Sequence, residues 1–210
     1  MIPECSEKSS SSLEMIKLED LVITELNDTS VLKDFYCGVK PMDQFIHDGL
    51  QLSIANHYCC AYTVKVGINN PIDAIFALNF DSLDLDLDDK DEMMDGSSST
   101  DKPLLTDDYK EIFLNKLHYP ALEISYLAVR QDSQKSGLGR TIIEFIIKRA
   151  QEQAFAGCQF LTVEALATSS YSSVGFYEGC HFSPCEYPNP NKGTLRMYRT
   201  LYPANMVEGI

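Results

Sequence analysis

Runs of apolar residues in the first half of the chain alternate between the spacing of strands and the spacing of helices. Residues 21–26 form a short, β-branched run, which predicts a first strand. From Met42 to Ile54 apolar residues recur at nearly helical spacing, behind a proline suited to a first turn. Residues 59–66 and 72–78 predict two more strands, and the turn residues between them make the pair a predicted hairpin.

The second half contains a strand, a loop, a helix and a strand in direct succession. Residues 121–129 are mostly apolar, which predicts a strand buried on both faces. From Arg140 apolar residues recur with helical period, and Gly157 ends the predicted helix. Residues 160–163 form the next buried strand. This order predicts a βαβ unit with a right-handed crossover, and the pattern over 106–117 predicts a helix before it.

Length and charge set the domain organisation. The sequence has 210 residues, 44% of them hydrophobic, which suits one domain at 19–205 behind a flexible tail at 1–18. The formal net charge is −14, and nine acidic and two basic residues at 81–102 give −7 of it. We expect this stretch to be a solvated, mobile low-complexity insertion. The negative field disfavours a nucleic-acid partner, although a local basic groove could still bind tRNA.

Several function classes are disfavoured by the composition. No apolar run reaches the roughly 18 residues that span a bilayer, and residues 1–16 lack a signal-peptide core. We therefore expect a cytoplasmic protein with no membrane partner. The four histidines show no metal-binding spacing, so no metal site is predicted. The seven cysteines are odd in number and irregularly spaced, which indicates reduced thiols: Cys5, Cys37, Cys59, Cys60, Cys158, Cys180 and Cys185.

The loop between the predicted strand and helix of the second half is the strongest candidate for binding. Residues 134–140 contain Gly137 and Gly139, where backbone amides can approach a ligand closely, and the helix start adds positive dipole character. Lys135 and Arg140 flank the glycines. Together these residues predict a cradle for a pyrophosphate. A tight turn without a ligand is the other interpretation, and the spacing alone does not decide between them.

At this loop the chain resembles the GNAT superfamily of acetyl-CoA-dependent N-acetyltransferases. The family's phosphate loop has glutamine or arginine, two residues, glycine, one residue, and glycine or alanine, which Gln134, Gly137 and Gly139 match. Downstream, Phe176 and Tyr177 resemble a second family element, in which His181 replaces the usual glycine. The resemblance covers about 120–201 well. It implies an α/β fold with a mostly antiparallel mixed sheet, a V-shaped splay between two parallel strands, and helices on both faces.

The first half carries a narrower resemblance. Residues 35–38 and 42–46, with 120–121 before the central strand, are similar to the toxin-type GNAT branch that acetylates aminoacyl-tRNA. This resemblance implies the amino group of aminoacyl-tRNA as one candidate acceptor. The acidic composition favours another, a small cationic amine or a lysine or N-terminal amine.

The GNAT resemblance implies roles for residues of the second half. The end of the central strand would pair with the pantetheine arm, and alternation would put Glu123, Ser125, Leu127 and Val129 on one face. Glu123 would be the base that deprotonates the acceptor, and a surface glutamate in a salt bridge is the alternative. The residues expected to hold acetyl-CoA are Leu127, Ala128, Val129, Gln134, Lys135, Ser136, Gly137, Leu138, Gly139 and Arg140.

Tyr177 matches the family tyrosine that lies near the cofactor sulfur. Its phenol would protonate the departing CoA thiolate, with Tyr171 as a weaker substitute and a packed aromatic as the alternative. The predicted function is acetyl transfer from acetyl-CoA to a primary amine by direct attack in a ternary complex. Acetylation of aminoacyl-tRNA and a non-catalytic acyl-CoA-binding module are the rivals, and a homodimer stays open.

Overall fold

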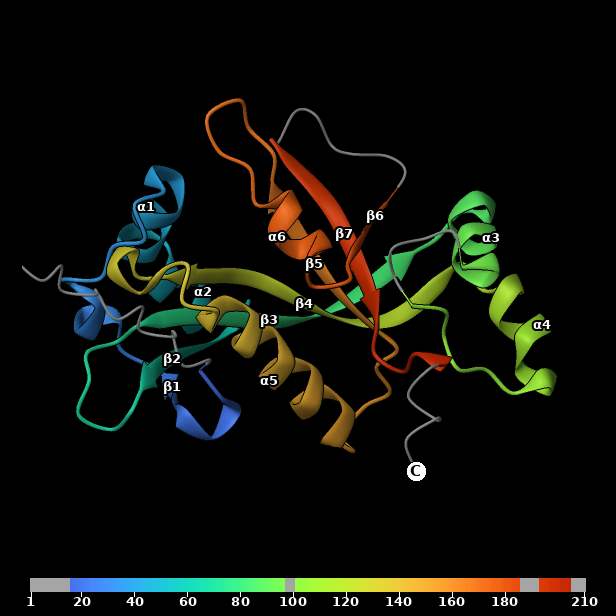
Figure 1. The fold of residues 1–210 in the computed structure, drawn as a ribbon, viewed down its shortest axis with the longest axis horizontal. Coiled ribbons are helices and arrows are strands. Elements are labelled where there is room, and N and C mark those ends of the chain that lie inside the picture. Colours follow the sequence, from blue (N-terminus) through green and yellow to red (C-terminus); the bar gives the residue numbers. More distant parts are fainter. Residues whose placement is uncertain (1–15, 97–100, 186–192, 205–210) are drawn as a thin grey trace, which may run out of the picture.

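The computed structural model describes residues 16–96, 101–185 and 193–204. Its centre is a seven-stranded sheet with the order β1-β2-β3-β4-β5-β7-β6 (Figure 1). The strands are β1 (Leu21–Leu26), β2 (Cys60–Val66), β3 (Ala74–Asp84), β4 (His118–Val129), β5 (Phe160–Leu166), β6 (Ser183–Pro184) and β7 (Thr194–Thr200).

The two central strands are the only parallel neighbours in the described sheet, and they pair over a short length. Residues 121–124 of β4 pair with residues 160–163 of β5, and all other neighbouring strands are antiparallel. Both strands continue beyond the paired segment, so they part after Ile124 and Val163. A mostly antiparallel mixed sheet with a splayed parallel pair confirms the predicted fold class.

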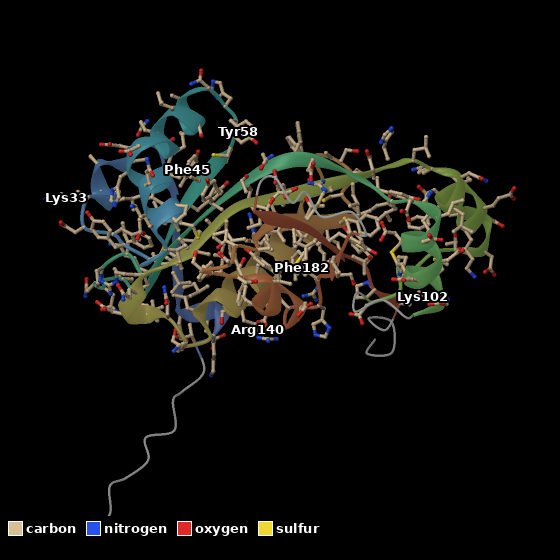
Figure 2. All side chains as sticks on the ribbon, turned by 90° about the horizontal axis from the view of Figure 1, so that it is seen from above. Lys33, Phe45, Tyr58, Lys102, Arg140 and Phe182 are labelled. Carbon is tan, nitrogen blue, oxygen red and sulfur yellow. The ribbon has the colours of Figure 1, made fainter. Side chains whose placement is uncertain are left out.

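Helices cover both faces of the sheet. Leu127 of β4 packs in the hydrophobic cluster that contains α5, whereas Ala128 packs in the cluster that contains α1 and α2. Neighbouring strand residues point to opposite faces, so these helices lie on opposite sides. In Figure 2, Phe45 of α1 and Arg140 of α5 lie on the two sides of the sheet. The helices are α1 (Lys40–Asp48), α2 (Leu50–Ala55), α3 (Leu87–Asp95), α4 (Asp107–Asn115), α5 (Leu138–Glu152) and α6 (Val174–Glu178), with 3-10 turns at Leu18–Asp20, Thr29–Leu32 and Gln131–Ser133.

A bulge in β4 changes which residues share a face. Successive residues of β3 pair with Tyr126 and then with Ile124, so Ser125 is an extra residue on β4. Ile124 and Leu127 are three residues apart, yet both pack in the α5 cluster. An inserted residue reverses the alternation beyond it. The prediction that Glu123 shares a face with Leu127 is therefore wrong, because Glu123 lies on the face opposite α5.

The acidic stretch is largely folded, which differs from the mobile insertion expected at 81–102. Residues 81–84 belong to β3, and α3 follows. Leu83, Leu85 and Met93 are buried in a third hydrophobic cluster with Phe160 of β5. Leu83 and Leu85 alternate with aspartates, as expected for a strand with one buried face. The segment therefore continues from β3 into a lobe formed by α3 and α4 (Figure 1), in which Asp89 and Lys90 are buried together with Met93.

For the remaining predicted helices and strands, the type of element agrees with the structure better than the predicted length does. β1 has the predicted bounds, and α4 lies inside the predicted helix. β3 and β5 run further than predicted, and α5 ends at Glu152 instead of Gly157. Residues 1–15 of the predicted tail lie outside the described residues, and Ile16 packs against the main core. Within the described ranges, no helix is both long and apolar enough to cross a membrane.

Candidate active site

The loop between β4 and α5 is held in an unusual backbone conformation. Gly137 has φ +89° and is the N-cap residue of α5, and Lys135 has φ +62°. A positive φ favours glycine, which explains Gly137 at this point although a Cβ there would meet open space. The first amides of a helix have no intrahelical acceptor and carry partial positive charge. The start of α5 therefore presents donors suited to an anionic group.

Side-chain hydrogen bonds fix this loop to its surroundings. Gln134 Nε2 donates to the carbonyl oxygens of Val129, 3.0 Å away, and Cys37, 2.7 Å away. The first bond ties the loop to the end of β4, and the second ties it to the segment before α1. Ser136 Oγ donates to the Ser133 carbonyl oxygen at 2.7 Å. These bonds fix the position of Gln134 relative to β4 and to the segment before α1, and the Ser136 bond closes a turn within the loop.

Gly139 lets α5 approach α6 closely. A Cβ built on Gly139 would lie 3.1 Å from the Phe176 ring, which is tighter than an ordinary contact. Phe176 in turn packs edge-on against Tyr177, with 5.0 Å between ring centroids. The second glycine of the motif therefore has a packing role. It couples the loop to the helix that carries Tyr177.

A cavity of about 620 Å³ extends from this loop into the opening between β4 and β5. Most of the residues predicted to hold acetyl-CoA line it: Leu127, Ala128, Val129, Gln134, Lys135, Gly137, Leu138, Gly139 and Arg140. Tyr177 and Tyr171 line it as well. Among the described residues, Ser136 and Glu123 are predicted site residues that do not line the cavity. The segment before α1 and α1 itself close one side with Cys37, Val39, Pro41 and Met42.

The cavity meets β4 where one edge of that strand has lost its partner. Residues 127–129 pair with β3 on one side. On the other side the described pairing with β5 stops at Ile124. The backbone groups of this edge therefore face the cavity, where an extended ligand can bind as an added strand would.

Tyr177 lines the cavity and is buried against aromatic rings. Its side chain packs between Phe176 and Phe182, with the Phe182 ring centroid 5.5 Å away, and the residue is 6% exposed. Burial raises the pKa of the Tyr177 phenol well above its usual value, and the nearby Cys180 and Tyr171 add to the rise. The hydroxyl therefore stays protonated at neutral pH, as a proton donor must.

Glu123 lies behind the cavity wall. Its carboxylate accepts a 2.8 Å hydrogen bond from Asn79 Nδ2 on β3, and Asn79 Oδ1 accepts a hydrogen bond from Ser125 Oγ. Ser125 lines the cavity, so Glu123 is linked to it through two side chains. Burial raises the pKa of Glu123, partly offset by the Asn79 hydrogen bond, and Asp81 raises it further. A raised pKa makes a carboxylate a stronger base.

The sequence interpretation missed Glu164, which is the carboxylate that lines the cavity among the described residues. A sequence signal was present in Ala165 and Leu166, apolar residues that continue the strand past Val163, with Glu164 between Val163 and Ala165. The predicted strand stopped at Val163, one residue too early. The predicted alternation placed Ser125 on one strand face with Leu127. The bulge that brings Ser125 to the cavity has no signature in the sequence.

Comparison with known proteins identifies the domain. Residues 105–182 match the model of the acetyltransferase (GNAT) family, a range that includes the loop at 134–140, α5 and α6. The chain carries a GNAT acetyltransferase domain. The matched region supports an acyltransferase, and the GNAT resemblance stated from the sequence motifs is confirmed.

Solved structures similar to this GNAT domain include bacterial toxins. AtaT complexed with acetyl-methionyl-tRNAfMet has 19% sequence identity, a TM-score of 0.61, and coverage of 90% of this chain and 98% of that one. AtaTR bound with acetyl-CoA has 19% identity, a TM-score of 0.61 and coverage of 90% and 97%. A tyrosine-to-phenylalanine mutant of KacT has 15% identity, a TM-score of 0.61 and coverage of 90% and 98%. No curated protein sequence matches the chain.

Proposed function

We propose that this GNAT domain transfers the acetyl group of acetyl-CoA to a primary amine by direct attack within a ternary complex. The observation that supports this most is the continuous cavity, which joins the anion-binding start of α5 to the opening between β4 and β5 and to Tyr177. Its 620 Å³ volume lies within the usual range for sites that hold small molecules and cofactors.

Acetyl-CoA would bind along the length of this cavity. The amides at the start of α5, with Lys135 and Arg140, would hold the pyrophosphate. The unpaired edge of residues 127–129 would hydrogen-bond the pantetheine arm. The thioester then lies near Tyr177. Structures of the similar toxin AtaT with acetyl-CoA support this assignment of the nucleotide thioester.

The acceptor amine would lose a proton and attack the thioester carbonyl. A new C–N bond forms as the C–S bond breaks, and the departing thiolate takes a proton from Tyr177. The nitrogen loses its remaining surplus proton as the amide forms, and this proton restores the Tyr177 phenol. Glu123 is the proposed base. Because its carboxylate is screened from the cavity by Asn79 and Ser125, the proton would reach it through water.

A second candidate acceptor is the amino group of aminoacyl-tRNA, favoured by the likeness to AtaT complexed with acetyl-methionyl-tRNAfMet. The surface charges argue against it. Five basic residues could contribute to a tRNA groove on this side of the domain: Arg130, Lys135, Arg140, Lys148 and Arg149. Arg130 pairs with Asp73 at 3.3 Å, and Lys148 and Arg149 both pair with Glu152. The other two, Lys135 and Arg140, line the cavity. A small cationic amine therefore fits this chain better.

The proposal is tested by titrating the protein with acetyl-CoA in a calorimeter and by following CoA release chromatographically with a panel of amines. Tyr177→Phe should lower kcat by about a hundredfold or more, since general acids typically contribute that much. Acetyl-CoA affinity should stay unchanged. Tyr202→Phe is the matched control, because Tyr202 is exposed and is absent from the described cavity lining. Failure to bind acetyl-CoA would overturn the function, and an unchanged kcat would overturn the role of Tyr177.

A further inference from the structure

Ser125 and Glu164 face each other across the point where the central strands part. The last parallel pair is Ile124 with Val163. Ser125 and Glu164 are the next residues of β4 and β5, so they would be partners if the pairing continued. Both line the cavity. They therefore stand on its two walls at the narrow end of the splay.

Both side chains project to the sheet face opposite α5. Glu164 pairs in register with Arg196 and lies two residues after Thr162, which pairs with Glu123. Residues in register, and residues two apart on a strand, share a face. Ser125 Oγ reaches the same face, because it bonds to Asn79, the register partner of Glu123.

The Glu164 carboxylate is held in place from β7. Thr194 Oγ1 donates to one oxygen at 2.8 Å, and Arg196 Nη1 donates to the other at 3.5 Å. Arg196 makes its shorter contact, 2.7 Å, with Asp81 on β3. One guanidinium is thus shared by two carboxylates, and Glu123 adds a third acidic group to the same face. A cation that enters beside Glu164 meets a net negative charge.

Ser125 offers a second acceptor at this point. Its hydroxyl hydrogen is donated to Asn79 Oδ1, so the oxygen lone pairs remain for a donor in the cavity. The bulge is what brings this residue to the cavity. A hydroxyl and a carboxylate on opposite walls match the several N–H donors of one ammonium group.

We propose that Ser125 and Glu164 bind the ammonium of the acceptor at the apex of the splay, and that this pair selects protonated primary amines. Thr194 and Arg196 act as positioning residues that fix the Glu164 carboxylate. The inference rests on the proposed acetyl transfer and deepens it by naming the group that receives the acceptor. The ammonium would then give up its proton before attack, next to the thioester.

The test compares kinetics with charged and uncharged amines at saturating acetyl-CoA. The charged probes are spermidine, a lysine peptide with a blocked N-terminus, and methionyl-tRNA. The uncharged probe is 2,2,2-trifluoroethylamine, which is mostly neutral at pH 7. Glu164→Gln should raise KM for the best charged probe about tenfold or more, with kcat changed much less. The kcat/KM for trifluoroethylamine and the affinity for acetyl-CoA should not change.

Further variants separate recognition from folding. Ser125→Ala should raise KM in the same direction by about threefold, since it removes a neutral hydrogen bond. Thr194→Val should give an intermediate effect, because Glu164 keeps its charge but loses an anchor. Glu25→Gln on the exposed part of β1 removes one charge outside the described cavity lining and should change nothing.

The outcomes distinguish this inference from the proposed function. If the wild-type protein fails to bind acetyl-CoA or acetylates none of the probes, the proposed function falls and the ammonium site falls with it. If the wild type is active and Glu164→Gln leaves the preference for charged over uncharged amines unchanged, the ammonium site alone is wrong. If Glu164→Gln misfolds and loses acetyl-CoA binding, the test uses Glu164→Asp and Thr194→Val instead. The ammonium site is then wrong if both variants keep the wild-type preference for charged over uncharged amines.

Discussion

Glu123 and Glu164 project from neighbouring strands onto the same face of the sheet, but their surroundings differ. Glu123 is held by a neutral amide, and burial raises its pKa. Glu164 is held by a hydroxyl and a guanidinium and opens to the cavity. Two carboxylates in different environments can take different tasks. A proton acceptor benefits from the first environment and an ammonium-binding group from the second.

The half-buried charge of Glu123 should cost some stability, which partial exposure to solvent reduces. Because its pKa is raised in the folded state, folding disfavours the ionised form at any pH above that pKa. At a pH well below the ordinary value of 4.5, the carboxyl is protonated in both states and the cost disappears. Glu123→Gln should therefore raise the melting temperature at pH 7 by up to a few degrees, with about 2–4 °C for each kcal/mol in a chain of this size. The gain should vanish on acidification.

Thermal unfolding at several pH values checks this expectation. Glu25→Gln serves as the control, since Glu25 is exposed on β1 and its replacement should leave the melting temperature unchanged. A Glu123→Gln protein that is less stable than wild type at pH 7 would contradict the assigned cost. The same variant, if Glu123 is the base, also loses acetyl transfer, so higher stability would accompany lower activity.

At the scale of elements, the loop proposed to bind the pyrophosphate is connected to Tyr177, the proposed acid, through a contact between α5 and α6. Gly139 in the first turn of α5 leaves no room for a side chain beside the ring of Phe176 in α6, the residue before Tyr177. Both helices meet at the cavity, where Gly139 and Phe176 are lining residues. A shift of α5 should therefore move the loop proposed to bind the pyrophosphate and Tyr177 together.

Gly139→Val should weaken acetyl-CoA binding at least tenfold. Its side chain would begin 3.1 Å from the Phe176 ring, so α5 or Phe176 must move, and displacement of the loop amides weakens their hydrogen bonds to a pyrophosphate. Calorimetry with acetyl-CoA measures the loss. Gly157→Val is the control, because a Cβ there meets open space and its φ is not in the left-handed region. Equal affinity in both variants would show that the contact has no role in binding.

The sequence predicted the elements that form the end of the cavity proposed to bind the pyrophosphate. Glycine spacing and helical period defined the β4–loop–α5 unit, because both are local properties of the chain. The bulge at Ser125 depends on the pairing between β3 and β4, which brings together residues far apart in the sequence. For this reason, local sequence patterns could not predict that Glu123 and Leu127 lie on opposite faces of the sheet.

The acidic segment shows a different kind of miss. The prediction of a solvated insertion was based on the aspartates. Leu83 and Leu85, which alternate with aspartates, have the spacing of a strand with one buried face. The buried partner of that strand, including Phe160 of β5, lies in the second half of the chain. Lys90 of α3 is also buried, with Nζ donating to the carbonyl oxygens of Leu114 and Lys116 near the end of α4. Charge composition alone predicts a solvated segment, but in the structure this segment packs against the rest of the domain.

At the scale of the whole molecule, the charges divide the cavity into two ends. Lys135 and Arg140 stand at the end that would hold the pyrophosphate, and Glu164 with its acidic neighbours stands at the other. The overall charge of −14 adds a long-range field of the same sign as the acidic end. Such a field raises the local concentration of cations and lowers that of polyanions.

Salt should therefore act in opposite directions on different acceptors. Raising the ionic strength from about 20 to 300 mM shortens the screening length from about 20 Å to below 10 Å. At saturating acetyl-CoA, kcat/KM for spermidine should then fall several-fold, because attraction to the acidic end is screened. The value for trifluoroethylamine should stay constant, since a neutral amine feels no net field. For methionyl-tRNA a rise with salt would indicate relieved repulsion, whereas a steep fall would indicate a basic tRNA groove. A salt-independent rate with spermidine would contradict electrostatic selection of the acceptor and leave shape as the basis of specificity.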